Sequence, residues 1–420
     1  MKTIAIVGFG SRGQMFARLL AKEENKAQAK LVAIAEPIAY SRNRGITEYG
    51  IPEAFCFATA DAFFEKGKIC DAVFICTQDK QHCEMVLRAL ELGYDVLLEK
   101  PAGVSLEECV AIRDKANELG RKVMLTHVLR YAPFYQVIKK VIASGELGNV
   151  VAIDQTENIA YWHFALSFVR GPWRNVKEST PSIIAKCCHD LDIIKWLMDK
   201  KCTHISSFGR LFYFNPENAP QGSAEYCVDC DKTVKENCIY NAYKIYPQRM
   251  KRAVVGGMAR LNADNIMDML DNKQDRIAKC IYHSGNDALD NQVVNMQFED
   301  GSTAHLTMTA FSAECHRNIQ VHGTKGEIYG DLEDGLLTLN VYGQPSKKID
   351  PQSLNVDGVN LDGGHGGGDY YLLKDFLDYI TCNTSSFTRT TIDDSIESHI
   401  MGFKAEESRL QNGKVMKLEV

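Results

Sequence analysis

The sequence contains no apolar run of the roughly 18 or more residues that a membrane-spanning helix requires. It also lacks a strong excess of one charge: the 420 residues carry a formal net charge of −6, and both signs are interspersed among the 24% that are charged. This balance gives no reason to expect nucleic acid or an anionic membrane as a partner. We therefore expect a soluble, cytoplasmic protein that binds a small neutral or polar ligand.

Internal repeats and low-complexity segments are absent as well. The chain starts with MKTIAIVGFGSRG, which has neither a long apolar segment nor a small-residue cleavage site, so we interpret it as a first β-strand rather than a signal peptide. With 45% hydrophobic residues the chain can bury a large core, and 420 residues fit two domains better than one.

The first 126 residues alternate short apolar runs with helical patterns. This alternation is typical of βαβ units and predicts an α/β Rossmann domain with a parallel sheet over residues 1–126. The expected strands are 3–8, 30–36, 71–77, 94–100 and 122–126, and the expected helices are 11–24, 38–48, 79–93 and 105–119.

The pattern changes after residue 126, and we expect a second domain over 127–420. Two alternating segments joined at Asp300 and Gly301 predict a hairpin, and further strands follow in 317–332 and 335–343. The prediction is an α+β domain with a predominantly antiparallel open sheet and helices on one face. Its expected helices are 132–144, 182–198, 370–382 and 391–411, and residues 214–285 are interpreted as an insertion.

A glycine-rich loop follows the first predicted strand. Gly8, Gly10 and Gly13 have the GxGxxG spacing, in which the glycines allow a tight turn and let the backbone approach a pyrophosphate at a helix N-terminus. Glu36 ends the second predicted strand, where a carboxylate accepts hydrogen bonds from the adenosine ribose and repels a 2′-phosphate. We therefore predict NAD rather than NADP as cofactor, with Ser11 and Arg12 of the loop also in contact; the nearby Arg42 and Arg44 weaken this preference.

Glu99, Lys100 and Pro101 end the predicted strand 94–100, at the carboxyl edge where ligands of open parallel sheets bind. The ammonium group of Lys100 could therefore reach a substrate oxygen, although on this evidence alone Lys100 could equally be a surface lysine. Further along, His189 lies on the predicted helix 182–198, with Lys186 and Asp192 one turn to either side. A histidine beside a carboxylate can act as a general base, but it can also simply pack at a domain interface.

Six segments together resemble the glucose-fructose oxidoreductase/inositol dehydrogenase (Gfo/Idh/MocA) family along nearly the whole chain. The resemblance implies a lysine and a histidine beside the nicotinamide, at Lys100 and His189, and a homodimer or homotetramer. It also favours cofactor contacts from Thr77, His82 and Glu99. The segments are GFGSRG at 8–13, TQDKQH at 77–82, ALELGYDVLLEKP at 89–101, RYAPFY at 130–135, CCHDLDIIKWL at 187–197 and GTKGEIYGDL at 323–332.

The sequence departs from the family pattern before His189. Many members have an aspartate four residues earlier, where this chain has Ala185, followed by Lys186. We count Lys186 and Asp192 among the candidate catalytic residues. Lys186 could bind substrate, lower the pKa of His189, or replace the missing polar group.

An aromatic and basic segment follows the predicted strand 150–159. Aromatic faces stack on sugar rings, while arginine and histidine donate hydrogen bonds to hydroxyl groups, so we predict a substrate-binding wall, although a purely structural loop would look similar. His365, in a glycine-rich segment, could bring a further loop over the site. The predicted substrate-binding residues are Arg130, Tyr131, Trp162, His163, Arg170, Trp173, Arg174 and His189.

Most of the 14 cysteines lie in apolar segments, where a reduced thiol behaves as a small hydrophobe. Cys227, Cys230 and Cys238 instead have metal-ligand spacing in the insertion, and Cys280 or His283 could complete a site. The hypothesis is a structural zinc ion that supplies folding energy to this segment; the alternative is a set of unrelated reduced thiols.

These observations favour an NAD-dependent oxidoreductase that transfers hydride to or from a hydroxyl-bearing carbon of a sugar, sugar derivative or cyclitol. One alternative is an NAD-dependent glycosidase of the same fold, which oxidises the sugar transiently and eliminates the aglycone without net NADH. A second alternative is an NAD-binding sensor without catalytic activity.

Overall fold

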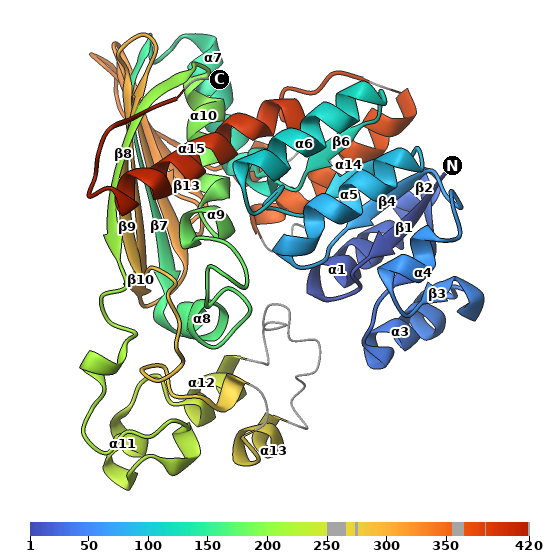
Figure 1. The fold of residues 1–420 in the computed structure, drawn as a ribbon. Helices are drawn as coiled ribbons and strands as arrows, with labels where there is room; N and C mark the ends of the chain where they lie inside the picture. Colours follow the sequence, from blue (N-terminus) through green and yellow to red (C-terminus); the bar gives the residue numbers. More distant parts are fainter. Residues whose placement is uncertain (250–265, 274–275, 355–364, 383, 419–420) are drawn as a thin grey trace.

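The computed structural model describes residues 1–249, 266–273, 276–354, 365–382 and 384–418. The first part of the chain builds a six-stranded parallel sheet in the order β3-β2-β1-β4-β5-β6, as predicted for a Rossmann domain (Figure 1). Its strands are β1 (Lys2–Val7), β2 (Ala29–Ala35), β3 (Cys56–Phe57), β4 (Ala72–Ile75), β5 (Asp95–Leu98) and β6 (Val123–Leu125). Its helices are α1 (Ser11–Leu20), α2 (Glu23–Lys26), α3 (Ala39–Tyr49), α4 (Ala60–Phe64), α5 (His82–Glu91) and α6 (Leu106–Glu118).

The local sequence explains these elements. Every residue of β4 is buried, as expected for a strand covered on both faces, and this explains why the strand is a continuous apolar run. At the start of α6 the side chain of Ser105 accepts a hydrogen bond from the backbone N–H of Glu108, which caps the helix at the residue where its apolar pattern begins.

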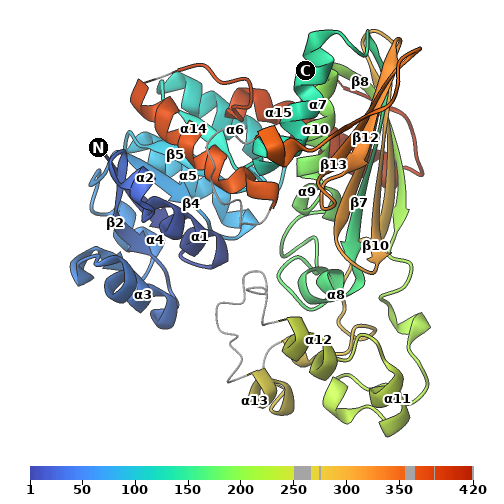
Figure 2. The same cartoon turned by 180° about the vertical axis from the view of Figure 1, so that it is seen from behind.

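A helix from the far end of the chain completes this sheet. α14 (Gly368–Cys382) buries Leu372, Phe376 and Ile380 in the same core as Ile6 and Phe74, and the rings of Phe74 and Phe376 lie edge to face. The views from both sides show α14 beside the Rossmann helices (Figures 1 and 2). A division of the chain at residues 126 and 127 stays a prediction, and α14 contributes to the core on the other side of it.

The second part builds a nine-stranded sheet in the order β14-β13-β12-β11-β7-β10-β9-β8-β15. Among the described strands of this second sheet, only β7 and β10 pair in parallel, so the sheet is predominantly antiparallel, as predicted. The predicted hairpin joins β9 to β10 through Gly301, whose φ of 87° a side chain would disfavour. The strands are β7 (Val150–Ala160), β8 (Cys202–Arg210), β9 (Asn291–Phe298), β10 (Thr303–Ser312), β11 (His316–Gly323), β12 (Gly326–Asp331), β13 (Leu336–Val341), β14 (Lys347–Ile349) and β15 (Met416–Lys417).

Helices cover the face of this sheet that is turned toward the Rossmann domain (Figures 1 and 2). They are α7 (Pro133–Ser144), α9 (Ser182–Ala185), α10 (Cys188–Met198) and α15 (Ile392–Leu410). α15 packs against α6 as well as against α10 and β8, so it joins the two halves of the molecule. None of the described helices is long and apolar enough to cross a membrane.

Two segments differ from the predicted elements. The helix expected over 182–198 is interrupted at Lys186 and Cys187, which separate α9 from α10. The aromatic segment after β7 is helical, with α8 (Tyr161–Phe164) followed by one wide helical turn, Ala165–Val169.

The insertion leaves the sheet after β8 and returns at β9. Its described helices are α11 (Lys232–Asn237), α12 (Ala242–Arg249) and α13 (Ile266–Asp271), which project beyond one end of the sheet (Figure 1). Residues 250–265 and 274–275 of the predicted insertion lie outside the described residues.

Candidate active site

A cavity of about 510 Å³ lies at the carboxyl edge of the parallel sheet. One side consists of the glycine loop and the ends of β2, β4 and β5, and the other comes from residues of the second half of the chain, including His163, Lys186 and His189. Both predicted halves of the site therefore share one space.

The glycine loop has the geometry that its three glycines predict. Gly8 has a φ of 89°, and a Cβ there would lie 2.5 Å from the carbonyl oxygen of Cys76. A Cβ on Gly13 would lie 2.2 Å from the carbonyl oxygen of Gly8, so this glycine allows α1 to pack against the loop. A Cβ on Gly10 would meet nothing within 4 Å, as expected for a position that faces a ligand.

Glu36 lies at the end of β2 and lines the cavity. Its carboxylate accepts hydrogen bonds from the backbone N–H groups of Phe9 (2.8 Å) and Ile38 (2.9 Å), which fix it beside the glycine loop. The two arginines that weakened the expected preference for NAD have partners elsewhere. Arg42 donates to the backbone oxygen of Glu36 itself, and Arg44 pairs with Glu48, so each already has a partner in the protein.

The remaining predicted cofactor residues fall into two groups. Ser11, Arg12, Thr77 and Glu99 line the cavity, and Arg12 bridges Glu99 (2.5 Å) and Asp369 (2.8 Å) at the start of α14. His82 is 1% exposed and does not line the cavity among the described residues. Its ring nitrogens contact the backbone oxygens of Pro101 and Thr77 instead, so it fixes the backbone around Thr77 and Lys100.

Lys100 follows β5 at the floor of the cavity. Its Nζ donates to the backbone oxygen of Ala185 (2.7 Å) and lies 5.7 Å from the ring centroid of Trp173. The carbonyl of Ala185 at the end of α9 thus holds the ammonium group next to the start of α10. The predicted position of Lys100 beside His189 agrees with this geometry; its role stays a prediction.

His189 lies in the first turn of α10 and is 5% exposed. Its Nδ1 is buried and has no hydrogen-bond partner among the described residues. Burial, and then the charge of Lys100, lowers the pKa of His189 well below its usual value, so the imidazole is neutral at physiological pH. A neutral imidazole that lines a cavity can accept a proton from a bound hydroxyl group.

Lys186 occupies the break between α9 and α10 and also lines the cavity. Its Nζ lies 3.2 Å from the carboxylate of Glu157 on β7, which also pairs with Arg317 on β11. Arg317 in turn pairs with Asp190 (3.1 Å). Behind the cavity wall there is therefore a buried network of alternating charges.

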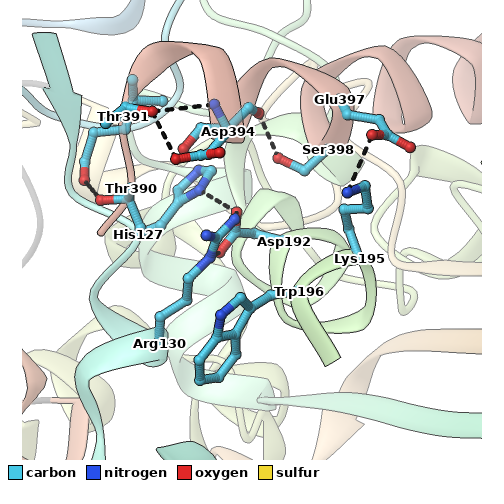
Figure 3. A network of polar contacts seen from close by, with 12 residues as sticks. His127, Arg130, Asp192, Lys195, Trp196, Thr390, Thr391, Asp394, Glu397 and Ser398 are labelled. Carbon is cyan, nitrogen blue, oxygen red and sulfur yellow. Dashed lines mark hydrogen bonds and ion pairs between the residues drawn. The ribbon is translucent and has the colours of Figure 1, made fainter. Parts of the chain in front are cut away.

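Asp192 does not belong to the cavity, and its prediction as a catalytic neighbour of His189 is wrong. It lies between His127 and Arg130, as Figure 3 shows, with His127 Nδ1 at 2.8 Å from its Oδ1 and two hydrogen bonds from Arg130. Burial alone would raise the pKa of Asp192, but Arg130 and His127 hold it well below its usual range. The physical reason is that His127 and Arg130 engage both carboxylate oxygens of Asp192, so this group is directed to these two side chains rather than to the cavity.

Three of the predicted substrate residues line the cavity: His163, Trp173 and His189. The other five predicted substrate residues do not line the cavity in the described part of the chain. Arg130 donates hydrogen bonds to Asp192, and the hydroxyl group of Tyr131 donates to Asp375 (2.7 Å). Trp162 packs beside His163, and Arg174 pairs with Glu178.

Arg170 is a clear correction, because it is buried at the base of the insertion. Its Nε donates to the backbone oxygen of Lys279 (2.7 Å) and its Nη2 to that of Tyr240 (2.8 Å). Both acceptors belong to the insertion, so Arg170 fixes the insertion to the sheet and does not contact substrate.

The structure does not support the zinc hypothesis. Cys227, Cys230, Cys238 and Cys280 do line one small cavity of about 10 Å³. However, within the described part of the chain no group of three or more His, Cys, Asp or Glu side chains is arranged to hold a metal ion. Cys227 and Cys230 accept hydrogen bonds from Arg170 and from the backbone of Ala224. His283 contacts Ser223 instead.

Sequence reasoning missed several cavity residues. Arg317 shares the buried face of β11 with Ile319 and Val321, so a charged residue at an apolar position of the alternation was the available signal. Asp79 accepts hydrogen bonds from Trp173 Nε1 (3.0 Å) and Ser179, and thereby links the two halves across the cavity. His365, expected only as part of a loop, lines the cavity and lies 3.1 Å from Asp369.

Comparison with known families gives two matches that cover most of the chain. A model described as "Oxidoreductase family, NAD-binding Rossmann fold" matches residues 2–127, and one described as "Oxidoreductase family, C-terminal alpha/beta domain" matches residues 139–416. Both carry the name of the Gfo/Idh/MocA family.

Curated relatives extend these matches. The oxidoreductase YteT of Bacillus subtilis is 26% identical over 331 residues, which are 76% of this chain and 74% of YteT. A scyllo-inositol 2-dehydrogenase (NAD(+)) of Bacillus subtilis is 30% identical over 207 residues, 49% of this chain and 57% of that one. A 2,7-anhydro-N-acetylneuraminate hydratase of Mediterraneibacter gnavus is 27% identical over 202 residues, 47% of this chain and 50% of that one. These last two relatives match over only about half of their lengths.

A solved structure shares the whole fold. An inositol dehydrogenase homolog from Azotobacter vinelandii, complexed with NAD+, superposes with a TM-score of 0.71 and covers 99% of this chain and 97% of its own. The two sequences are 17% identical, so the likeness concerns the fold.

Proposed function

The chain belongs to the Gfo/Idh/MocA family of NAD-dependent oxidoreductases, and within this family we propose that it transfers hydride to or from a hydroxyl-bearing carbon of a sugar, sugar derivative or cyclitol. One observation carries the proposal. Lys100 from the first half of the chain and His189 from the second half line the same cavity as the glycine loop.

The residues on the cofactor side fit NAD. The open space beside Gly10 receives the pyrophosphate at the N-terminus of α1, and the carboxylate of Glu36 accepts hydrogen bonds from the ribose. Bound NAD supplies the hydride acceptor in oxidation, or the donor when reduced. Because Arg42 and Arg44 have other partners, we propose that NADP binds less well.

The protein side chains handle the proton and the developing charge. His189 accepts the hydroxyl proton during oxidation, since its ring is neutral and the residue lines the cavity. Lys100 stabilises the negative charge that develops on the substrate oxygen, and its hydrogen bond to Ala185 keeps the ammonium group in place. Lys186, on the same wall, is proposed to bind substrate rather than to relay the proton.

A redox-neutral reaction is the second candidate, in which oxidation is transient and the cofactor is regenerated after an elimination. The observation that favours it is the similarity to a hydratase, whose name describes a reaction without net oxidation. The glycosidase alternative belongs to the same class. The same cavity residues serve both reactions, because each begins with removal of a hydroxyl proton.

One assay separates the candidates. Purified protein is incubated with NAD and a panel of free sugars, cyclitols and glycosides, while NADH absorbance and organic products are followed in parallel. NADH with an oxidised product supports the dehydrogenase. A hydrated or cleaved product without net NADH supports the redox-neutral reaction, and the absence of any product from the protein with NAD bound contradicts both.

We also propose a homodimer or homotetramer that forms through the face of the nine-stranded sheet opposite α10. Helices cover only one face in Figures 1 and 2, and Val151, Phe208 and Phe311 on its strands are exposed. Native mass spectrometry tests this proposal. A monomer at micromolar concentration, or a dimer that Phe208→Asp and Phe311→Asp leave intact, would contradict it.

A further inference from the structure

The two sides of the cavity differ in charge. The acidic side chains that line it are Glu36, Asp79 and Glu99, and all three belong to the first half of the chain. The side contributed by residues beyond 126 has no lining carboxylate among the described residues, but it has Lys186 and Arg317. Lys100 faces the same space and forms no ion pair with any described carboxylate.

The carboxylates that pair with these cations do not line the cavity in the described part of the chain. Glu157 is shared between Lys186 and Arg317, and Asp190 pairs with Arg317 alone. Both carboxylates are essentially inaccessible, at 1% and 0% exposure, so they lie behind the cations as seen from the cavity. On this wall two cations, Lys186 and Arg317, therefore pair with two buried carboxylates, and Lys100 from the other half adds a third cation that has no carboxylate partner among the described residues.

The two histidines of the wall, His163 and His189, are neutral, and nearby cations contribute to the lowered pKa of both rings. Burial and then the charges of Lys186 and Lys100 lower the pKa of His163 to about 3. His189 is kept neutral by burial and then by Lys100. Both neutral rings can form hydrogen bonds with hydroxyl groups, and neither adds negative charge to the surface that lines the cavity.

From this arrangement we infer that the substrate is an anionic sugar derivative, with a carboxylate or a phosphate group bound at the wall formed by Lys186 and Arg317. Because the carboxylates that pair with Lys186 and Arg317 are inaccessible, a ligand on this side of the cavity meets these cations and Lys100 rather than the acidic groups. Arg317 also presents one terminal nitrogen, Nη1, that has no partner among the described residues, and a guanidinium group suits either anion. The inference rests on the proposed function for the position of the reacting carbon, but the charge preference itself can be measured without turnover.

The test is a binding measurement on the full-length protein saturated with NADH. Isothermal titration calorimetry compares D-glucose with D-glucuronate, the neutral methyl ester of D-glucuronate and D-glucose 6-phosphate, and the galactose series repeats the comparison. We expect one of the two anions to bind about 10- to 100-fold more tightly than its neutral counterparts, the range for hydrogen bonds to charged groups. The carboxylate and phosphate arms show which anion the wall selects.

A variant locates the preference. Lys186→Met keeps the length of the side chain and removes its charge, while Glu157 keeps Arg317 as a partner. We expect the ratio of anionic to neutral affinity to fall about 10-fold. Lys195→Met is the matched control, because Lys195 also forms a 3.2 Å ion pair, with Glu397, but does not line the cavity. It should leave the ratio unchanged.

The outcomes separate this inference from the proposed function. Equal or undetectable binding of charged and neutral ligands, or a preference that survives Lys186→Met, overturns the anionic substrate. Neutral sugars that are oxidised as efficiently as their acids also overturn it while the proposed oxidoreductase stands. An anion preference that depends on Lys186, with no chemical change of any ligand in the presence of NAD, supports the charged wall and contradicts the proposed function.

Discussion

Two titratable residues on α10, His189 and Asp192, are three positions apart and both buried, but their side chains have different surroundings. His189 lines the cavity, and its buried Nδ1 has no partner among the described residues, whereas both carboxylate oxygens of Asp192 are engaged by Arg130 and His127 (Figure 3). Burial alone therefore does not mark a functional group. A titratable side chain that lines a cavity is a candidate for catalysis, whereas one whose polar atoms are all paired in the interior is a candidate for a structural role.

The strongest way to test this contrast is to remove the cavity-facing groups. We expect His189→Ala and Lys100→Ala each to lower kcat about 10²- to 10⁴-fold, the usual contribution of acid–base assistance, with NAD affinity nearly intact. Steady-state kinetics and NADH fluorescence titration measure the two quantities. Because both residues serve one transition state, the double variant should lose less than the product of the single losses. Full activity in both single variants would refute the assignment.

Replacing the paired residue Asp192 should change the stability of the protein rather than its catalytic rate. Asp192→Ala leaves Arg130 and His127 without their carboxylate partner, and we expect a loss of about 3–5 kcal/mol in the free energy of unfolding, measured in urea. Because the pKa of Asp192 is depressed in the folded protein, its contribution is present above pH about 4, the unfolded pKa, and is lost as pH falls below it. Lys195→Met, which breaks a more exposed pair on the same helix, should cost less than 1 kcal/mol, roughly the value of a surface pair. Equal losses in the two variants would contradict the distinction.

The cofactor side offers a third comparison, between Glu36 and its neighbours. Glu36→Gln keeps the shape but removes the charge that repels a 2′-phosphate, so we expect the preference for NAD over NADP to fall about 10-fold, roughly one charge interaction. Dissociation constants for NADH and NADPH measure the change. Arg44→Gln is the control, because Arg44 pairs with Glu48 and does not line the cavity. An unchanged preference in Glu36→Gln would show that this carboxylate does not contact the ribose.

The smallest expected effect is in the pH dependence. The pKa of His189 is lowered by burial and then by Lys100, His365, His127 and Arg317, so the ring stays neutral as pH falls through 6.5. We expect NMR titration of the His189 ring, assigned with His189→Ala, to show no protonation between pH 7 and 6. The acidic limb of kcat/KM should accordingly lie below the usual histidine pKa of about 6.5. Protonation with a midpoint near 6.5 would contradict the buried, cation-flanked site.

Local rules explain why much of the fold was predictable. The alternation of buried strands and amphipathic helices predicted the parallel sheet, and the glycine spacing placed a turn that admits no side chain at Gly8 or Gly13. The hairpin at Gly301 follows from the same kind of local constraint. The return of α14 to the first sheet was not predictable in this way, because its apolar face fits either core.

The candidate site was predicted only in part, for a similar reason. Lys100 and His189 were assigned through a family resemblance, and the structure brings both to one cavity. Asp192, Arg130 and Arg170 were assigned by residue type, but each side chain finds its partners in the protein interior. Arg317 was missed because it lies about 130 residues from Asp190, with which it pairs.

The sequence by itself therefore determined the βαβ order, the glycine loop, the carboxylate at the end of β2 and the family. These depend on short-range sterics and hydrophobic periodicity, which are properties of neighbouring residues. Only the tertiary structure decided which buried charges are paired and which face the cavity. Lys186 lies at the break between α9 and α10 and lines the cavity, whereas Asp192 is paired with His127 and Arg130. The packing of distant strands brings Arg317 to the same cavity wall as Lys186. Whether a polar atom finds a partner depends on residues far apart in the chain, so it cannot be inferred from local spacing.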